Sequence, residues 1–224
     1  MHALSNCKTA FSSLINVTHP FDAIKDCEGP TATTLIYNPN EVPKYGGFKR
    51  ALFGHSSHPI ISHSTSVCIK QCWYQCKASG AQLIYDSHTQ ITKISAEINY
   101  LCWASALMEI IYNFVNKHIK VHGEPSFMIP KMCFIKNALA IVNTTHEVFM
   151  VEEVINETVD ETFVKYIGNG SVKPFDFLSS GAAYRADFLA FSQHVQYLKT
   201  KGLAFIGDFQ GKLSMSNEPV MYIY

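Results

Sequence analysis

An acidic residue and an amide lie two positions apart in the segment Asp208-Phe209-Gln210-Gly211. The apolar run from Leu203 to Phe209 predicts a strand, and alternate side chains of a strand point to the same face. Asp208 and Gln210 would then offer a carboxylate oxygen and an amide oxygen side by side, which are ligands suited to Mg²⁺. Asp and Gly are also frequent in turns, so an ordinary strand-to-turn junction is the alternative.

A lysine lies inside a second β-forming segment, Ser66 to Cys76. A charge at Lys70 is costly in an apolar strand unless a partner meets it. Nucleotide kinases place such a lysine against the phosphates and steady it with a glutamate from a helix. Glu97, early in the first predicted helix, is the candidate partner. The alternative is an edge strand from which Lys70 extends its ammonium group into water.

Two glycine-containing turns lie beside basic residues. Lys165 precedes Gly168-Asn169-Gly170, and Gly46-Gly47 precedes Lys49 and Arg50. Such turns can present backbone N–H groups to an anion. They are equally typical of ordinary hairpins, so neither turn alone indicates a phosphate site.

Three cysteines, Cys68, Cys72 and Cys76, share a spacing of four that places them on one face of a helix or a strand. A structural zinc site normally has four ligands, and the remaining candidates, His63 and His88, are distant. We therefore expect no zinc. The sequence contains no HExxH, G-x-S-x-G, P-loop or H-R-D with D-F-G motif. These absences exclude the corresponding hydrolases, P-loop enzymes and conventional protein kinases.

The composition is typical of a folded domain. Among 224 residues, 47% are hydrophobic and 12% aromatic, which excludes a largely disordered chain. The 18 basic and 18 acidic residues cancel, so we expect neither nucleic acid nor a membrane surface as a partner. No apolar run approaches the roughly 18 residues of a spanning helix, and no signal-peptide pattern is visible. Seven cysteines, an odd number, predict reduced thiols and an intracellular, cytoplasmic location.

The periodicities predict many strands around two helices, which is an α+β fold. Apolar residues spaced by three and four predict helices over residues 89–116 and 185–198, and Thr92 is the candidate N-cap of the first. Residues 1–43 are predicted to be an irregular lead-in with short strands. Short β-forming runs predict the strands, over residues 45–53, 66–76, 129–134, 138–142, 148–154, 162–166 and 203–209.

The motifs taken in order resemble the atypical alpha-kinase family and are most similar to its fungal branch. The resemblance covers roughly residues 45–224, and the stretch from Phe191-Ser192-Gln193-His194 to Asp208-Phe209-Gln210-Gly211 is its most specific part. The complete series is Gly47-Phe48-Lys49-Arg50-Ala51, Val67-Cys68-Ile69-Lys70, Phe149-Met150-Val151-Glu152-Glu153, Phe163-Val164-Lys165-Tyr166, Leu189-Ala190-Phe191-Ser192-Gln193-His194 and Ile206-Gly207-Asp208-Phe209-Gln210-Gly211.

The resemblance implies a two-lobed kinase fold. Residues 1–44 would be a lead-in, residues 45–150 a strand-rich N-lobe and residues 151–224 an incomplete C-lobe that lacks the family's zinc module. The reaction implied is transfer of the ATP γ-phosphoryl group to a Ser or Thr hydroxyl of a protein substrate. The family's pattern assigns roles to these residues: Lys70 and Arg50 to the ATP phosphates, Glu152 to the adenine hinge, Asp208 and Gln210 to Mg²⁺, and Lys165 to support of the catalytic acid.

One departure concerns the catalytic carboxylate. The family has an aspartate ten residues after the metal aspartate, whereas this chain has Glu218, followed by Pro219. The longer side chain displaces the carboxylate, and a displacement near 1 Å can cost on the order of 10²-fold in rate. Two alternatives therefore stay open: a catalytically weakened or inactive nucleotide-binding pseudokinase, and a structural zinc- or partner-binding domain built around the three cysteines.

Overall fold

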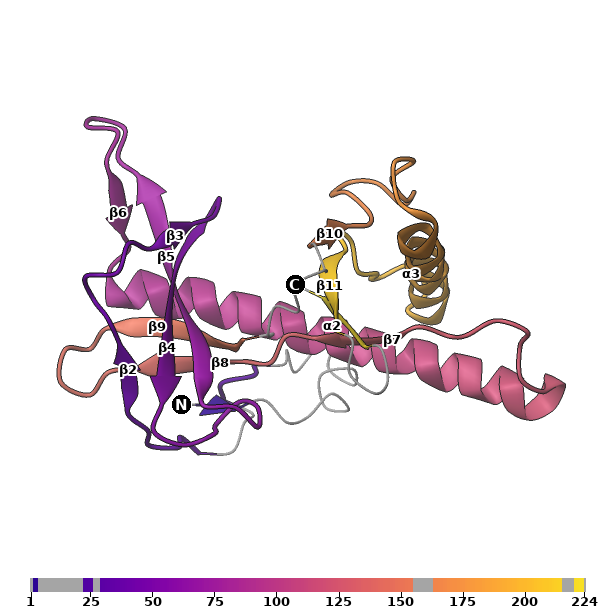
Figure 1. Cartoon of the computed structure of the whole chain (residues 1–224), viewed down its shortest axis with the longest axis horizontal. Helices are drawn as coiled ribbons and strands as arrows, with labels where there is room; N and C mark the ends of the chain where they lie inside the picture. The colour runs from indigo at the N-terminus through magenta and orange to yellow at the C-terminus, as the bar shows by residue number, and fades with distance from the viewer. Residues whose placement is uncertain (1, 4–21, 26–28, 155–162, 215–219, 224) are drawn as a thin grey trace. The chain divides into compact units, whose positions relative to one another are not determined.

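The computed structural model describes residues 2–3, 22–25, 29–154, 163–214 and 220–223. This described part contains a curled antiparallel sheet, a smaller second sheet and two helices, which confirms the predicted α+β class (Figure 1). The chain divides into two compact units.

The first unit contains the described residues of Met1–Asn6, Pro20–Cys102 and Lys136–Val154, and the second those of Trp103–Ile135 and Ile155–Tyr224. Helix α2 (Ser87–His122) belongs to both units, since its residues from Trp103 onward are assigned to the second.

The large sheet of the first unit is antiparallel throughout, and its strand order is β1-β8-β9-β5-β4-β2. The short strands β3 and β6 pair with β4 and β5. Long runs of β-branched, aromatic and Cys residues explain the central strands. The strands are β1 (His2–Ala3), β2 (Leu35–Tyr37), β3 (Lys44–Tyr45), β4 (Lys49–Ser56), β5 (Ser66–Gln75), β6 (Gln82–Ile84), β8 (Asn137–Ile141) and β9 (Val148–Glu153).

Strand β5 has two different faces. Val67 and Ile69 on one face pack with Phe149 and Val151 of β9 in a buried apolar cluster. The opposite face carries Cys68, Lys70 and Cys72, since side chains alternate along a strand. Helix α2 is fixed to this strand because the buried Gln90 side chain accepts from Cys72 N at 2.9 Å and donates to Cys72 O at 2.7 Å.

Helix α2 is longer than the predicted residues 89–116. Its N-cap is Asp86 rather than Thr92: Asp86 Oδ1 accepts from Thr89 N at 2.9 Å, and Oδ2 accepts from Thr89 Oγ1 at 2.8 Å. These hydrogen bonds lower the pKa of Asp86. The helix ends at His122, directly before Gly123, as the sequence predicts. Gly123 has a φ of 86°, and its N–H donates to Ile119 O.

Gly54 of β4 lies beside the edge strand β2, opposite Tyr37. A Cβ there would come within 2.5 Å of the Ile36 carbonyl oxygen, which is backbone and cannot rotate away. We expect Gly54→Ala to lower the free energy of unfolding by about 1–3 kcal/mol, as overpacking typically does. Gly47→Ala is the matched control, since nothing lies within 4 Å of its Cβ position. Urea unfolding of both variants checks this prediction, and equal stabilities would contradict it.

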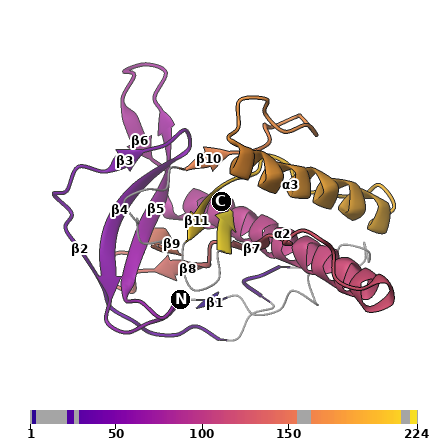
Figure 2. The same cartoon turned by 45° about the vertical axis from the view of Figure 1, so that its right-hand side comes forward.

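The second unit contains the later half of α2, helix α3 and a four-stranded sheet of order β10-β11-β12-β7 (Figure 2). Strands β12 and β7 are parallel, and the other pairs are antiparallel. Tyr166, Ile167, Leu189 and Phe209 are fully buried in its core. The elements are β7 (Lys131–Phe134), β10 (Val164–Lys165), α3 (Ser180–Lys199), β11 (Gln210–Ser214) and β12 (Val220–Ile223).

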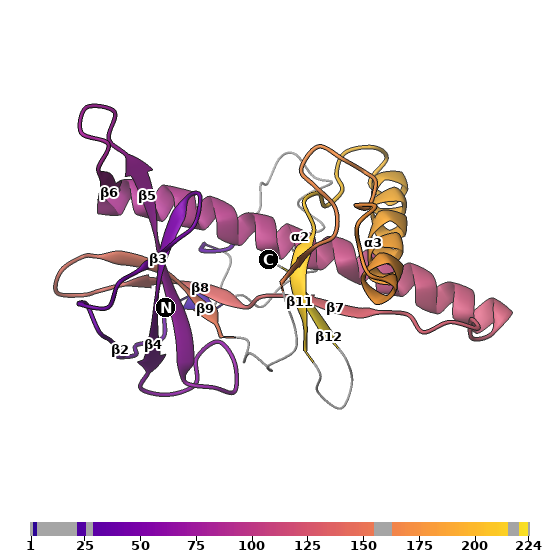
Figure 3. The ribbon, with the colours of Figure 1, turned by 45° about the horizontal axis from the view of Figure 1, so that its top comes forward.

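The predicted strand over residues 203–209 is wrong. This segment is irregular, and β11 begins only at Gln210 (Figure 3). Its backbone is held by side chains of α3 instead of by a neighbouring strand. Gln193 Nε2 donates to Ile206 O at 2.8 Å, and Gln196 Oε1 accepts from Ile206 N at 2.9 Å. Apolar side chains alone do not make a strand when the backbone finds such partners.

Among the described residues, no helix is both long enough and apolar enough to cross a membrane.

Candidate functional site

Two lysines and two glutamates form ion pairs on one face of the first unit. Lys70 of β5 pairs with Glu152 of β9, and Lys49 of β4 pairs with Glu97 of α2. Residues that pair directly across two strands share a face of the sheet, as do residues two apart on one strand. Lys70 pairs with Ala51, which is two residues from Lys49. Glu152 pairs with Cys68, which is two residues from Lys70, so the two lysines and Glu152 lie on one face. The exposed fraction is 20% for both lysine side chains and 7% for Glu152. The face therefore holds two positive charges, each balanced by a carboxylate and largely shielded from water.

The surroundings of Lys70 act on its pKa in two directions. Burial by itself lowers the pKa, because it penalises the charged form. The charge and hydrogen bond of Glu152, followed by the charges of Cys68 and Glu97, outweigh burial, so the pKa of Lys70 is raised. Lys70 is therefore held as a cation at neutral pH.

Glu97 bonds Lys49, whereas the sequence indicated it as the partner of Lys70. Its charge still contributes to the raised pKa of Lys70. Glu152, which the resemblance assigns to the adenine hinge, uses its carboxylate to bond Lys70. The two glutamates and two lysines thus form one electrostatic cluster.

Arg50 lies on the opposite face of the sheet from Lys70. Its register partner is Gln71, and its Nη2 and Nε atoms donate to Gln71 Oε1 at 2.6 and 3.2 Å. The structure does not bring Arg50 and Lys70 together. It brings Lys70 together with Lys49, a residue that sequence reasoning did not select. The register of β4 against β5 decides whether Lys49 or Arg50 lies on the Lys70 face, and the sequence alone does not show this register.

Cys68 and Cys72 share the Lys70 face, while Cys76 lies past the end of β5. Burial raises the pKa of Cys68 to about 11 and also raises that of Cys72. Hydrogen bonds, first of all from the Ser79 side chain, lower the pKa of Cys76. In the part of the chain that the structure describes, no group of three or more His, Cys, Asp or Glu side chains could hold a metal ion.

The thiols are expected to differ in reactivity. With a pKa of about 11, Cys68 is roughly one part in a thousand thiolate at about pH 8, and only the thiolate attacks an alkylating reagent. Iodoacetamide should therefore modify Cys76 before Cys68 in the folded protein, with the order lost in urea. Peptide mass spectrometry over a time course measures this order, and faster labelling of Cys68 would contradict it.

In the second unit, Lys165 and Asp208 form an ion pair with a separation of 2.8 Å between Nζ and Oδ1. Lys165 is also the register partner of Gln210 across β10 and β11. The structure thus brings together three residues that the sequence indicated. Glu218, the expected catalytic carboxylate, lies outside the described residues.

The conformation at Asp208 corrects one expectation. Asp208 and Gln210 do not share a face of one strand, because Asp208 precedes β11 and has a φ of 55°. Phe209 fixes this arrangement: its side chain is fully buried, and its carbonyl accepts from Tyr166 N at 2.9 Å and Ile167 N at 3.3 Å. Asp is among the residues that adopt the left-handed conformation most readily, so the position of its carboxylate follows from the anchored Phe209.

The Oδ1 atom of Asp208 is screened from water, although the side chain as a whole is 41% exposed. Its contact with Lys165 is ionic without hydrogen-bond geometry, so no described donor satisfies this oxygen. A carboxylate oxygen that is screened from water and accepts no hydrogen bond suits a divalent cation such as Mg²⁺.

Two glutamines of α3 and Thr200, the C-cap residue after this helix, hold the segment before Asp208, and the sequence analysis gave none of them a role. Gln193 and Gln196 bond Ile206 as described above, and Thr200 Oγ1 contacts Ala204 O at 2.9 Å and Ala204 N at 3.1 Å. All three are buried. Their spacing of three and four, in line with the buried Leu189, was the available signal, since polar residues on an apolar helix face need partners.

No known protein-family model matches this chain, and no curated protein matches it either.

Proposed function

We propose that this chain is an alpha-type, ATP-dependent protein serine/threonine kinase domain with a two-lobed fold. The observation that carries the proposal is the cluster of Lys49 and Lys70 with Glu97 and Glu152. Of the four groups Glu152 is buried, the two lysine side chains are 20% exposed and Glu97 is 36% exposed. Desolvating such pairs does not by itself favour folding, so their grouping on one face supports a binding role. Lysines steadied by carboxylates are the means by which kinases hold ATP phosphates.

The residues proposed to hold Mg²⁺ belong to the second unit. Asp208 and Gln210 provide carboxylate and amide oxygens, and Asp208 Oδ1 has no described hydrogen-bond donor. When bound, Mg²⁺ would neutralise negative charge on the transferring phosphates. Lys165 holds the Asp208 carboxylate in place through its ion pair. The proton of the substrate hydroxyl would pass to a carboxylate, a role proposed for Glu218.

A nucleotide-binding pseudokinase is the second candidate, and one observation favours it. The Lys165 ammonium group contacts the same Asp208 oxygen that a metal would need. A cation supplied by the protein itself can substitute for the charge of a metal ion, in which case nucleotide binding would persist without turnover. The two candidates predict different results in one experiment.

Thermal unfolding with and without Mg-ATP tests the proposal, together with phosphotransfer from labelled ATP to a Ser/Thr peptide library. Ligand at 100 times its Kd is expected to add about 2.7 kcal/mol to the free energy of unfolding. Asp208→Asn should remove the Mg²⁺-dependent part of this effect, and Asp176→Asn, at another exposed carboxylate of the second unit, should not. Stabilisation without phosphotransfer would support the pseudokinase. If neither occurs, both candidates are wrong.

A further inference from the structure

The second unit contains an apolar pocket that includes none of the residues discussed above as phosphate or metal ligands. It is formed by the end of α2, the segment that follows this helix, and the first half of α3. Its volume is about 530 Å³, and small-molecule sites typically measure about 300–1,000 Å³. The pocket is therefore large enough for a compact organic ligand.

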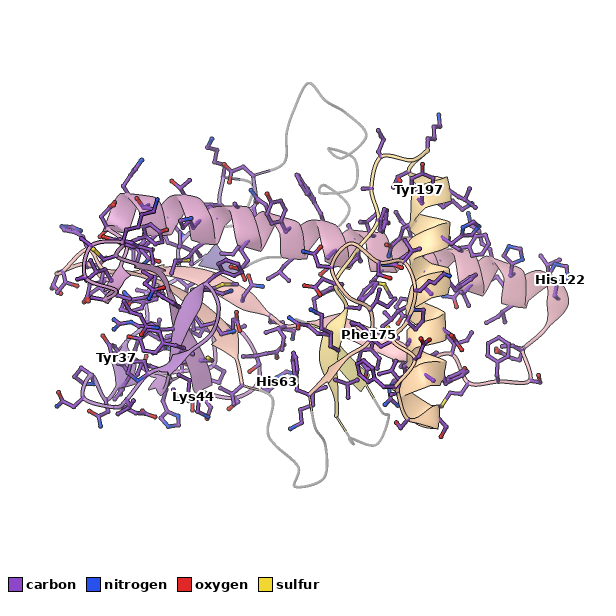
Figure 4. All side chains as sticks on the ribbon, turned by 90° about the horizontal axis from the view of Figure 1, so that it is seen from above. Tyr37, Lys44, His63, His122, Phe175 and Tyr197 are labelled. Atoms are coloured by element: carbon purple, nitrogen blue, oxygen red, sulfur yellow. The ribbon has the colours of Figure 1, made fainter. Side chains whose placement is uncertain are left out.

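The sequence builds one wall from residues four positions apart on α2. Phe114, His118 and His122 share a helix face, with ring centroids 4.4 Å apart for the first pair and 5.9 Å for the second. Figure 4 labels His122 at the end of this helix. On α3, Phe191 lies across from Phe114 at a centroid distance of 6.3 Å.

The segment after α2 closes another side of the pocket. Gly123 ends the helix with a positive φ, which allows the chain to turn back. The Tyr184 hydroxyl of α3 donates to Met128 O and so ties this segment to α3. Phe127, which lines the pocket, is still 59% exposed. An apolar ring held at a pocket mouth is well placed to cover a ligand.

Apart from the Tyr184 hydroxyl, which donates to Met128 O, each polar side chain of the lining can accept a hydrogen bond. Asp187 is a carboxylate, and His118 and His122 are imidazoles with an acceptor nitrogen when neutral. No Lys or Arg lines the pocket, and no basic side chain of the described residues pairs with Asp187. Aromatic faces also attract cations, and the Lys199 ammonium group lies 5.0 Å from the Phe114 ring centroid. This lining is complementary to a positive charge on an apolar molecule.

We propose that this pocket binds a small apolar amine, with its ammonium group on Asp187 and its apolar body among the rings of Phe114, Phe127 and Phe191. This inference goes beyond the proposed kinase function and does not depend on it.

Three probes of matched size test the proposal: 4-phenylbenzylamine, 4-phenylbenzyl alcohol and 4-biphenylacetate. Binding is measured by calorimetry at about pH 8. The amine is expected to bind about tenfold or more tightly than the alcohol, as one charge-assisted hydrogen bond allows, and the acid should bind more weakly than both. Asp187→Asn should reduce the amine to the level of the alcohol.

Asp176→Asn is the control for loss of a carboxylate outside the pocket, and thermal unfolding verifies that each variant is folded. Phe191→Ala should weaken the amine and the alcohol alike, because it removes apolar surface rather than charge. Equal binding of the three probes, no binding of the amine, or amine binding unchanged in Asp187→Asn would each overturn the proposal. The measurement requires neither ATP nor phosphotransfer, so its outcome is separate from that of the kinase test.

Discussion

Glu152→Gln is expected to lower the free energy of unfolding by about 3–5 kcal/mol, the usual cost of removing one partner of a buried ion pair. Glu152 is 5% exposed and bonds Lys70, whose side chain is 20% exposed. The substitution keeps the shape of the side chain and removes its charge. Lys70 then retains the cost of burial and loses the main group that offsets it.

Glu153→Gln is the matched control for this change. The neighbouring Glu153 Oε1 accepts from the backbone Lys136 N at 2.8 Å, and a glutamine oxygen can accept the same bond. We expect only a small loss of stability there. The double variant Lys70→Met/Glu152→Gln should recover much of the loss, because it removes both charges. Equal losses for Glu152→Gln and Glu153→Gln would contradict the assignment.

The pH dependence of the Glu152→Gln effect provides an independent measurement. In the wild type, folding raises the pKa of Lys70. The stability that Lys70 contributes is therefore complete below the unfolded-state pKa of about 10.4 and is lost as pH rises through the folded-state pKa. In the variant, the burial of Lys70 is expected to lower its folded-state pKa, so the unfolded state binds more protons and the free energy of unfolding increases with pH. The difference in urea midpoint between the two proteins should therefore narrow as pH rises from neutral towards the unfolded value.

The elements with strong periodicity could be predicted from the sequence. Helices α2 and α3 follow from apolar spacing, and β5 follows from its β-forming residues. The segment before Asp208 could not be predicted, because the Ile206 backbone bonds side chains that are distant in the sequence. Gln193 is 13 residues away and Gln196 is 10 residues away. An apolar run indicates burial, and only tertiary contacts decide whether its backbone pairs with a strand.

The candidate site was predictable in its residue types and not in its geometry. A lysine within an apolar strand requires a partner, which was correct for Lys70, but the identity of the partner depends on which strands are neighbours. Glu152 reaches Lys70 because β9 pairs with β5. The choice between Lys49 and Arg50 depends in the same way on the register of β4, and a shift of one residue would reverse it.

Lys70→Met is expected to reduce Mg-ATP affinity by roughly 10–100-fold, the cost of losing a charge-assisted hydrogen bond. The variant also leaves Glu152 buried without its ion-pair partner, so the measurement is made in Lys70→Met/Glu152→Gln, with Glu152→Gln alone as the reference. Lys49→Met/Glu97→Gln should weaken binding to a similar degree, because Lys49 lies on the same face as Lys70.

Arg50→Met distinguishes the strand register from the family resemblance. Arg50 lies on the opposite face and bonds Gln71, so its loss should leave ATP affinity near that of the wild type. The resemblance instead assigns the phosphate contact to Arg50. Calorimetric titration of folded variants with Mg-ATP separates the two: a large loss in Arg50→Met with none in the Lys49 variant would show that β4 presents its other face to the nucleotide. Full affinity in both lysine variants would remove the ion-pair cluster as the phosphate site.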